Sequence, residues 1–312
     1  MSFSIQIKTV DNFELIQISD SQTGIVATIL TRGALLNSWS IVDQGSTTEF
    51  VEGNDLSNGW KDFEQNGFRS AKMNPFACRL YKGSYAHLDK KYTIEKYYTN
   101  GHAIHGIIYD AIFSIKSSGV SDENAYVILE YQYLGQDKGF PFSYTIEVKW
   151  VVEANRKILV ATSITNQSDG SIPMVDGWHP YFTLGNTIED CTITFKAKGK
   201  MQYDQDLLPT GAIIEEKSFE QGKKIGSTLL DDGFELDQTN LTCSLENDLY
   251  SIKIQPNSNY PYLQLYTPPN RKSIAIENLS AAPNAFNNKM GLQLLEPHEN
   301  ILFKTSYQLF IK

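Results

Sequence analysis

Cysteine is scarce in this 312-residue chain, and the three cysteines, Cys78, Cys191 and Cys243, lie far apart in the sequence. An odd number of widely spaced cysteines argues against a disulfide framework and predicts a reducing compartment, so we expect the protein in the cytoplasm. No CxxC pair or Cys/His cluster has zinc-ligand spacing. His102 and His105 lie three residues apart but without a nearby carboxylate, so the sequence predicts no metal site.

Long hydrophobic runs are also missing. No apolar segment approaches the roughly 20 residues that a helix needs to span a bilayer. Residues 1–8 lack the basic and apolar regions of a signal peptide. We therefore expect a soluble protein with no membrane partner.

Positive charge is in deficit, with 27 Lys and Arg against 36 Asp and Glu, for a net charge of −9. Binding to nucleic acid needs clustered Lys and Arg, so no nucleic-acid partner is expected. The same balance disfavours a phosphorylated substrate, although a local basic pocket could override the average.

Helical patterns are the last absence, since no segment shows three turns of 3.6-residue periodicity; 60–65 and 204–208 could form single turns. Period-two alternation recurs instead from residue 13 to residue 311. It is clearest in 143–152, where the even-numbered residues Tyr144 to Val152 are apolar. Strands joined by short polar loops predict an all-β fold, a large antiparallel sandwich or barrel with very little helix. No linker, repeat or low-complexity tract interrupts the chain, which predicts a single domain over 1–312.

Aromatic residues, in contrast, are abundant, with 17 Tyr and 16 Phe. The sequence DGWHPYFTL at 176–184 places His179 among them. Pro180 biases His179 toward an extended backbone and ends or edges a strand. An imidazole held beside flat apolar rings suits proton donation to a sugar, whose C–H face packs on aromatic rings. The alternative is a buried histidine at a strand end.

Other polar residues stand in or beside apolar segments. Glu277 follows the predicted buried strand 273–276, where a carboxylate is costly unless it is paired or useful; it could also simply leave the strand for solvent. Arg79 has apolar neighbours and could clamp hydroxyl groups or pair with a surface acid. Gln264 faces away from Leu263 and Leu265, and Asp231 is expected in a turn.

This set of residues suits acid–base chemistry on a neutral polyol. Acyl transfer is disfavoured because the chain has no Gly-x-Ser-x-Gly elbow. Nucleotide chemistry is disfavoured because it has no glycine-rich phosphate loop.

Together these segments resemble the aldose 1-epimerase (galactose mutarotase) family. The motifs occur in the family's order: Arg79-Leu80 with Gly83, His105-Gly106, His179-Pro180-Tyr181-Phe182, Asp231 to Phe234, Gln264 with Tyr266-Thr267, and Glu277 with Pro283 and Ala285. The resemblance implies a β-supersandwich that interconverts the α and β anomers of a monosaccharide, an aldohexose, without a cofactor, as a monomer or homodimer.

The resemblance also implies roles for individual residues. Glu277 would be the general base at the C1 hydroxyl and His179 the general acid at the ring oxygen. His105 would hydrogen-bond near the ring oxygen, while Arg79, Asp231 and Gln264 would hold hydroxyl groups. Glu277 and His179 are then expected to face each other across a gap about as wide as a pyranose.

The chain departs from the family pattern at Asn74-Pro75, which replaces a Gly-Arg, and at Cys78, Ile107 and Asn284, which replace an Asn, a Gly and an Asp. These departures leave open a carbohydrate-binding protein without turnover. A hexose-6-phosphate mutarotase is also possible, with Arg69, Lys72 and Lys82 as available cations. A glycoside hydrolase would need a second carboxylate, for which Asp176 or Asp231 is the candidate.

Overall fold

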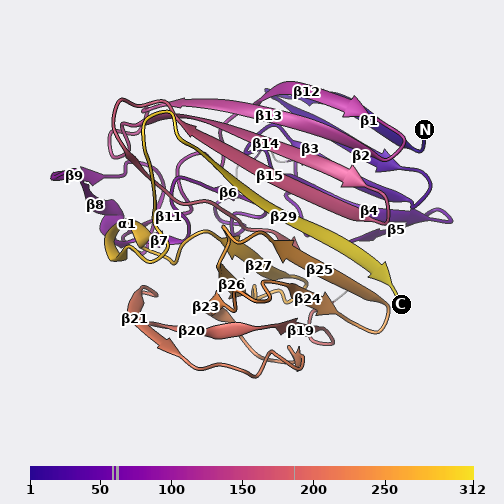
Figure 1. Ribbon diagram of the computed structural model, residues 1–312. Helices are drawn as coiled ribbons and strands as arrows, with labels where there is room; N and C mark the ends of the chain where they lie inside the picture. The colour runs from indigo at the N-terminus through magenta and orange to yellow at the C-terminus, as the bar shows by residue number, and fades with distance from the viewer. Residues whose placement is uncertain (58–59, 61–62, 186) are drawn as a thin grey trace.

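A computed structural model describes residues 1–57, 60, 63–185 and 187–312. The chain is built almost entirely of antiparallel strands (Figure 1). Within the described residues, helix is limited to the 3₁₀ turn η1 (Tyr81–Gly83) and the short α1 (Ala285–Asn288). None of the described helices is long and apolar enough to cross a membrane.

Two of the sheets follow the chain with few crossovers. The first is a five-stranded meander of β1 (Phe3–Val10), β2 (Phe13–Asp20), β3 (Ile25–Leu30), β4 (Leu36–Asp43) and β5 (Ser46–Glu49). The second has nine strands in the order β12 (Ser114–Val120), β13 (Asn124–Leu134), β14 (Ser143–Glu153), β15 (Lys157–Asn166), β29 (Asn300–Ile311), β25 (Tyr250–Pro256), β24 (Cys243–Glu246), β19 (Thr192–Phe195) and β22 (Lys223–Lys224). The C-terminal strand β29 thus closes against the middle of the chain.

A third large sheet carries most of the residues discussed below. Its order is β21 (Pro209–Ile214), β20 (Ala197–Tyr203), β23 (Asp231–Leu236), β26 (Tyr262–Tyr266), β27 (Ile274–Leu279), β17 (Gly177–Trp178) and β6 (Lys72–Met73), with β18 (Tyr181–Phe182) also paired to β27. Smaller sheets pair β10 (Tyr98–Thr99), β11 (His102–Ile104) and β7 (Arg79–Leu80), β8 (Ser84–His87) with β9 (Lys90–Thr93), and β16 (Ile172–Met174) with β28 (Gln293–Leu295).

The core lies between the nine-stranded sheet and the other two large sheets. On β14, the alternating residues from Tyr144 to Val152 are all buried, as the sequence predicts. Trp150 from this strand donates a hydrogen bond to the Ala34 carbonyl and packs against Trp178 on β17, with ring centroids 5.3 Å apart. One side chain therefore links the N-terminal meander to the sheet that carries His179.

Some local predictions need correction. Asp231 begins β23 rather than forming a turn, and Glu277 lies inside β27 rather than at its end. Both are part of continuous ladders, so their side chains are aimed by sheet register. Residues 204–208 form the loop of the β20–β21 hairpin and not a helical turn, and the turn expected at 60–65 includes 61–62, outside the described residues.

Candidate active site

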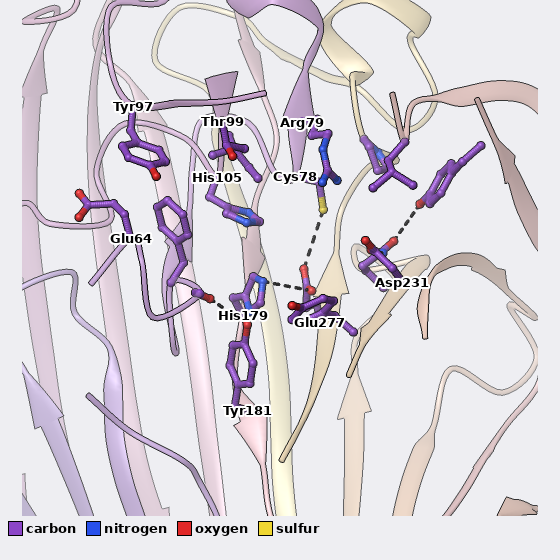
Figure 2. A pocket seen from close by; sticks show the side chains of 18 residues that line it. Glu64, Cys78, Arg79, Tyr97, Thr99, His105, His179, Tyr181, Asp231 and Glu277 are labelled. Atoms are coloured by element: carbon purple, nitrogen blue, oxygen red, sulfur yellow. Dashed lines mark hydrogen bonds and ion pairs between the residues drawn. The ribbon is translucent and has the colours of Figure 1, made fainter. Parts of the chain in front are cut away.

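A cavity of about 250 Å³ opens where β23, β26 and β27 face the segments around β7 and β11 (Figure 2). All six residues that the sequence singles out line it: Arg79, His105, His179, Asp231, Gln264 and Glu277. The sequence analysis missed other polar and aromatic wall residues, namely Glu64, Phe68, Tyr97, Thr99 and Tyr203. Their segments carry no local signal beyond ordinary loop and strand composition.

Sheet register brings two of these side chains, Gln264 and Glu277, together. Gln264 on β26 lies directly opposite Glu277 on β27, and on its other side it pairs with Gly233 on β23. A Cβ at Gly233 would come within 2.0 Å of the Tyr203 hydroxyl. A glycine is therefore required here for Tyr203 to reach Gln264.

The central feature is a direct contact between His179 and Glu277. Nε2 of His179 lies 3.3 Å from Oε1 of Glu277, and their side chains are only 6% and 2% exposed. The Tyr181 ring stacks on the imidazole at 5.0 Å, and the His105 ring meets it edge-on at 4.9 Å. The two groups do face each other, but they touch instead of leaving the gap that we expected.

Burial disfavours the charged form of both partners. Loss of solvent lowers the pKa of His179 to about 4. Loss of solvent also raises the pKa of Glu277 well above its ordinary value, and the negative charge of Asp231 adds to this rise. Between about pH 4 and the raised pKa of Glu277, the pair therefore holds a single acidic proton, and burial favours the form with Glu277 protonated and His179 neutral.

His105 sits above this pair in a constrained loop. Its backbone φ is +58°, and its Nδ1 lies 3.0 Å from Sδ of Met73. Burial, together with the neighbouring His179 and Arg79, lowers the pKa of His105 well below its ordinary value. The ring is thus a neutral hydrogen-bonding group at neutral pH.

On the other side of the cavity, a chain of hydrogen bonds fixes the polar side chains. The Tyr203 hydroxyl donates to Oε1 of Gln264 at 2.8 Å, and Nε2 of Gln264 donates to Oδ1 of Asp231 at 2.9 Å. Among the described residues, the guanidinium of Arg79 has no hydrogen-bond or ion-pair partner, which leaves its donors available to a ligand.

Of the departures from the family pattern, only Cys78 lines the cavity. Its Sγ lies 3.8 Å from Oε2 of Glu277. Asn284 instead accepts a hydrogen bond from the Tyr81 amide and donates its own amide to the Arg79 carbonyl, so it holds the β7 loop. Ile107 is buried outside the cavity wall.

Behind the cavity lies a separate buried ion pair. The ammonium of Lys72 contacts the carboxylate of Asp176, donates to the Thr162 hydroxyl at 3.0 Å, and lies 4.2 Å from the centroid of the Trp178 ring. Tyr260 donates a further hydrogen bond to Asp176. Neither charged residue lines the cavity, so Asp176 is not a second carboxylate of the site.

Within the described ranges, no group of three His, Cys, Asp or Glu side chains is arranged to hold a metal ion. The cavity wall carries carboxyl groups, imidazoles, phenols, a thiol, an amide and a guanidinium.

Comparisons with known proteins agree with this architecture. An uncharacterized Escherichia coli protein, YihR, is 24% identical over 234 residues, 72% of this chain and 74% of that protein. A galactose mutarotase-like protein of Clostridium acetobutylicum superposes with a TM-score of 0.87 at 17% identity, covering 100% of this chain and 99% of that one. A galactose 1-epimerase of Lactobacillus acidophilus gives 0.84 at 18% identity, covering 99% of each chain.

These superpositions confirm the predicted fold, an all-β galactose mutarotase-like supersandwich with very little helix. Residues 14–308 match the sequence profile of the aldose 1-epimerases. That match covers nearly the whole chain, and the protein therefore belongs to the aldose 1-epimerase family.

Proposed function

We propose that the protein is a mutarotase that interconverts the anomers of a free aldohexose. The observation that carries this proposal is the 3.3 Å contact between Glu277 and His179 in the wall of the cavity. In a pyranose, the C1 hydroxyl and the ring oxygen are attached to the same carbon. An acid and a base in contact with each other can therefore address both oxygens at once.

In the proposed reaction, the carboxylate of Glu277 takes the proton of the C1 hydroxyl. The freed electron pair forms the carbonyl, the bond from C1 to the ring oxygen breaks, and His179 gives its proton to that oxygen. Rotation about C1–C2 and the reverse steps close the other anomer. The pair begins and ends with one proton, so no cofactor is consumed.

Binding of the sugar would also prepare the pair for this reaction. In the empty cavity, burial favours the form in which the shared proton lies on Glu277 and His179 is neutral. A sugar hydroxyl that donates to the carboxylate stabilises its charged form, as does the Arg79 guanidinium. The charge-separated form that the reaction needs is then reached inside the complex.

The remaining wall residues are suited to hold the sugar. Asp231 and Gln264 offer fixed acceptors and donors to hydroxyl groups, and Arg79 offers free donors. His105 lies beside His179 and can donate toward the ring oxygen. The aromatic rings of Phe68 and Tyr181 provide flat surfaces for C–H groups.

Charge argues against a phosphorylated hexose. Among the described residues, the cavity wall contains the acidic side chains Glu64, Asp231 and Glu277 and one cationic side chain, Arg79. Burial favours the neutral form of Glu277, which leaves Glu64 and Asp231 to act against a phosphate. The cations that the sequence offered for a phosphate are engaged elsewhere. Arg69 pairs with Glu52, Lys72 is buried with Asp176, and Lys82 lies over the Tyr81 ring.

A glycoside hydrolase would place two carboxylates on opposite sides of the scissile bond. Here the groups in contact with the two oxygens of Glu277 are the His179 imidazole and the Cys78 thiol, and neither is a carboxylate. Release of an aryl aglycone would support hydrolysis, and sugar binding without turnover would support a binding protein.

The experiment is NMR of freshly dissolved α-D-glucose and α-D-galactose with and without protein. We expect acceleration by the wild type and at least a hundredfold loss in Glu277→Gln and in His179→Asn, because each removes one proton-transfer group. Glu246→Gln is the matched control, since Glu246 pairs with Lys312 on the surface and lies outside the cavity. No acceleration by the wild type, or unchanged rates in the two site variants, would refute the proposal.

A further inference from the structure

The two carboxyl oxygens of Glu277 have different partners. Oε1 faces Nε2 of His179 at 3.3 Å, while Oε2 lies 3.8 Å from the Sγ of Cys78, within range of an S–H···O hydrogen bond (Figure 2). Cys78 comes from the segment before β7 and Glu277 from the middle of β27, 199 residues later. The thiol reaches the carboxyl group from the opposite wall of the cavity.

The backbone holds this thiol in place. Cys78 has a φ of +52°, in the left-handed region that side-chain-bearing residues adopt only when their surroundings impose it. Its carbonyl accepts a hydrogen bond from the His105 amide at 2.9 Å, and the next residue, Arg79, pairs with β11. The same interactions that place His105 therefore also place the thiol.

Several other groups act on the Glu277 carboxyl, but they do so without donating to Oε2. The negative charge of Asp231 raises the pKa of Glu277, and the positive charge of Arg79 lowers it. His179 faces Oε1, and the phenols of Tyr181 and Tyr203 lie in the same wall. The Tyr181 and Tyr203 hydroxyls donate instead to the Gly67 carbonyl and to Gln264. Within the described residues, the donor at Oε2 is thus a thiol, which is a weaker donor than a hydroxyl or an amide.

We propose that Cys78 is a positioning residue for Glu277, whose weak hydrogen bond to Oε2 fixes the carboxyl group and sets the pH range over which it keeps the proton shared with His179. This inference rests on the proposed function for its consequence in catalysis. The thiol makes no covalent bond to the sugar and is not consumed.

The test is the pH dependence of kcat/KM in Cys78→Ala, Cys78→Ser and Cys78→Asn. The decrease of kcat/KM at high pH, its alkaline limb, reports loss of the proton of the Glu277–His179 pair. Removing the donor in Cys78→Ala should move this limb to higher pH, whereas the stronger donors in the Ser and Asn variants should move it to lower pH by about one unit. Cys191→Ser is the matched control, because Cys191 is also buried and donates a hydrogen bond to the Thr187 carbonyl away from the cavity. The alkaline limb of this variant should coincide with that of the wild type.

A second measurement needs no activity. The Glu277 carboxyl, labelled with ¹³C and assigned by its absence in Glu277→Gln, can be titrated in the sugar-free protein. The S–H infrared band that remains when the other two thiols are removed, in Cys191→Ser/Cys243→Ser, belongs to Cys78 and should lie at the lower frequency of a hydrogen-bonded thiol. Because Cys78 itself is unchanged, this readout remains informative even if a substitution at the strained position 78 prevents folding.

The two proposals fail in different ways. A wild type that accelerates mutarotation, with coincident alkaline limbs in all three Cys78 variants, would overturn the role of Cys78 alone. An S–H band at the frequency of a free thiol would do the same. A wild type without mutarotase activity, but with a Glu277 titration that moves between the variants, would overturn the proposed function and support the role of Cys78.

Discussion

At the scale of single residues, the cavity changes the chemistry of ordinary side chains mainly by removing water from them. Burial is the largest cause of the shifts at His179, His105 and Glu277, ahead of any neighbouring charge. All three shifts favour the neutral form. A cavity that disfavours charge suits a neutral substrate. A charge that forms during the reaction must then be stabilised by the substrate or by Arg79.

The proton shared by Glu277 and His179 predicts a bell-shaped pH profile of kcat/KM. As the pH falls through about 4, His179 becomes protonated while Glu277 keeps its proton. The pair then has no base to accept the proton of the C1 hydroxyl. As the pH rises through the raised pKa of Glu277, the pair loses its only proton and cannot protonate the ring oxygen. The alkaline limb should therefore lie well above the ordinary pKa of a glutamate, about 4.3.

The measurement is the initial rate of anomerisation at low sugar concentration, corrected for the uncatalysed rate, with circular dichroism at each pH to exclude unfolding. An acid limb near pH 6.5, the ordinary range of histidine, would show that burial does not control the pair.

Substitution of Arg79 should weaken sugar binding without lowering the stability of the fold. Its guanidinium has no partner among the described residues, so Arg79→Met should leave the midpoint of thermal unfolding nearly unchanged. Loss of hydrogen bonds to sugar hydroxyls should raise KM by about tenfold, which corresponds to about 1.4 kcal/mol. Arg79→Lys keeps the positive charge, so its KM should rise less than that of Arg79→Met. An unchanged KM in Arg79→Met would argue against contact between Arg79 and the sugar.

At the scale of strands, sheet register explains both the successes and the errors of the sequence analysis. The alternation in 143–152 correctly gives the buried face of β14, because burial repeats with the pleat. The sequence Asp-Asp-Gly is typical of turns and predicts a turn at Asp231, yet the ladder with β26 begins at Asp231 and includes all three residues. Pairing with a strand more than thirty residues away in the chain overrides the local preference, and no local pattern reports that pairing.

The strands behind the site also depend on a buried charge pair. Lys72 on β6 and Asp176, next to β17, have fully buried side chains, and the two strands pair at Trp178 and Lys72. Lys72→Met would leave the Asp176 carboxyl buried without its cation, so we expect a loss of about 3–5 kcal/mol in the free energy of unfolding. Urea denaturation measures this loss.

The double variant Lys72→Met/Asp176→Asn provides the control. Removing both charges should restore part of the lost stability, because no uncompensated charge remains. Equal stability of the wild type and Lys72→Met would show that the pair contributes little, and a further loss in the double variant would point to the Tyr260 and Asn74 hydrogen bonds to Asp176 instead.

At the scale of the whole molecule, composition and periodicity predict the fold class, because long strands such as β14 and β15 alternate buried and partly exposed residues. The six residues that the resemblance singles out all line one cavity, and their roles stay predictions. The contact between Cys78 and Glu277, and the involvement of Tyr203 and Glu64, could not be predicted. These contacts depend on how separate sheets pack around the cavity and on the left-handed backbone at Cys78. No short segment of the sequence contains that information.

The net charge of −9 and the acidic cavity act together on the choice of substrate. A hexose 6-phosphate would approach a negative molecule and place a dianion in a cavity whose wall includes Glu64 and Asp231. We expect kcat/KM for glucose to exceed that for glucose 6-phosphate by on the order of tenfold or more at low salt. Since the screening length falls from about 10 Å at 0.1 M to about 3 Å at 1 M salt, the difference should narrow as salt is added.

Glucose itself is the internal control for this last prediction. It carries no charge, so its kcat/KM should stay nearly constant over the same salt series, and any common drift would reveal a general effect of salt on the protein. Glu64→Gln removes one wall carboxylate outside the His179–Glu277 pair and should raise kcat/KM for the phosphorylated sugar more than for glucose. A preference for glucose 6-phosphate that weakens with salt would instead mean that Arg79 dominates the field of the cavity and that the substrate is a sugar phosphate.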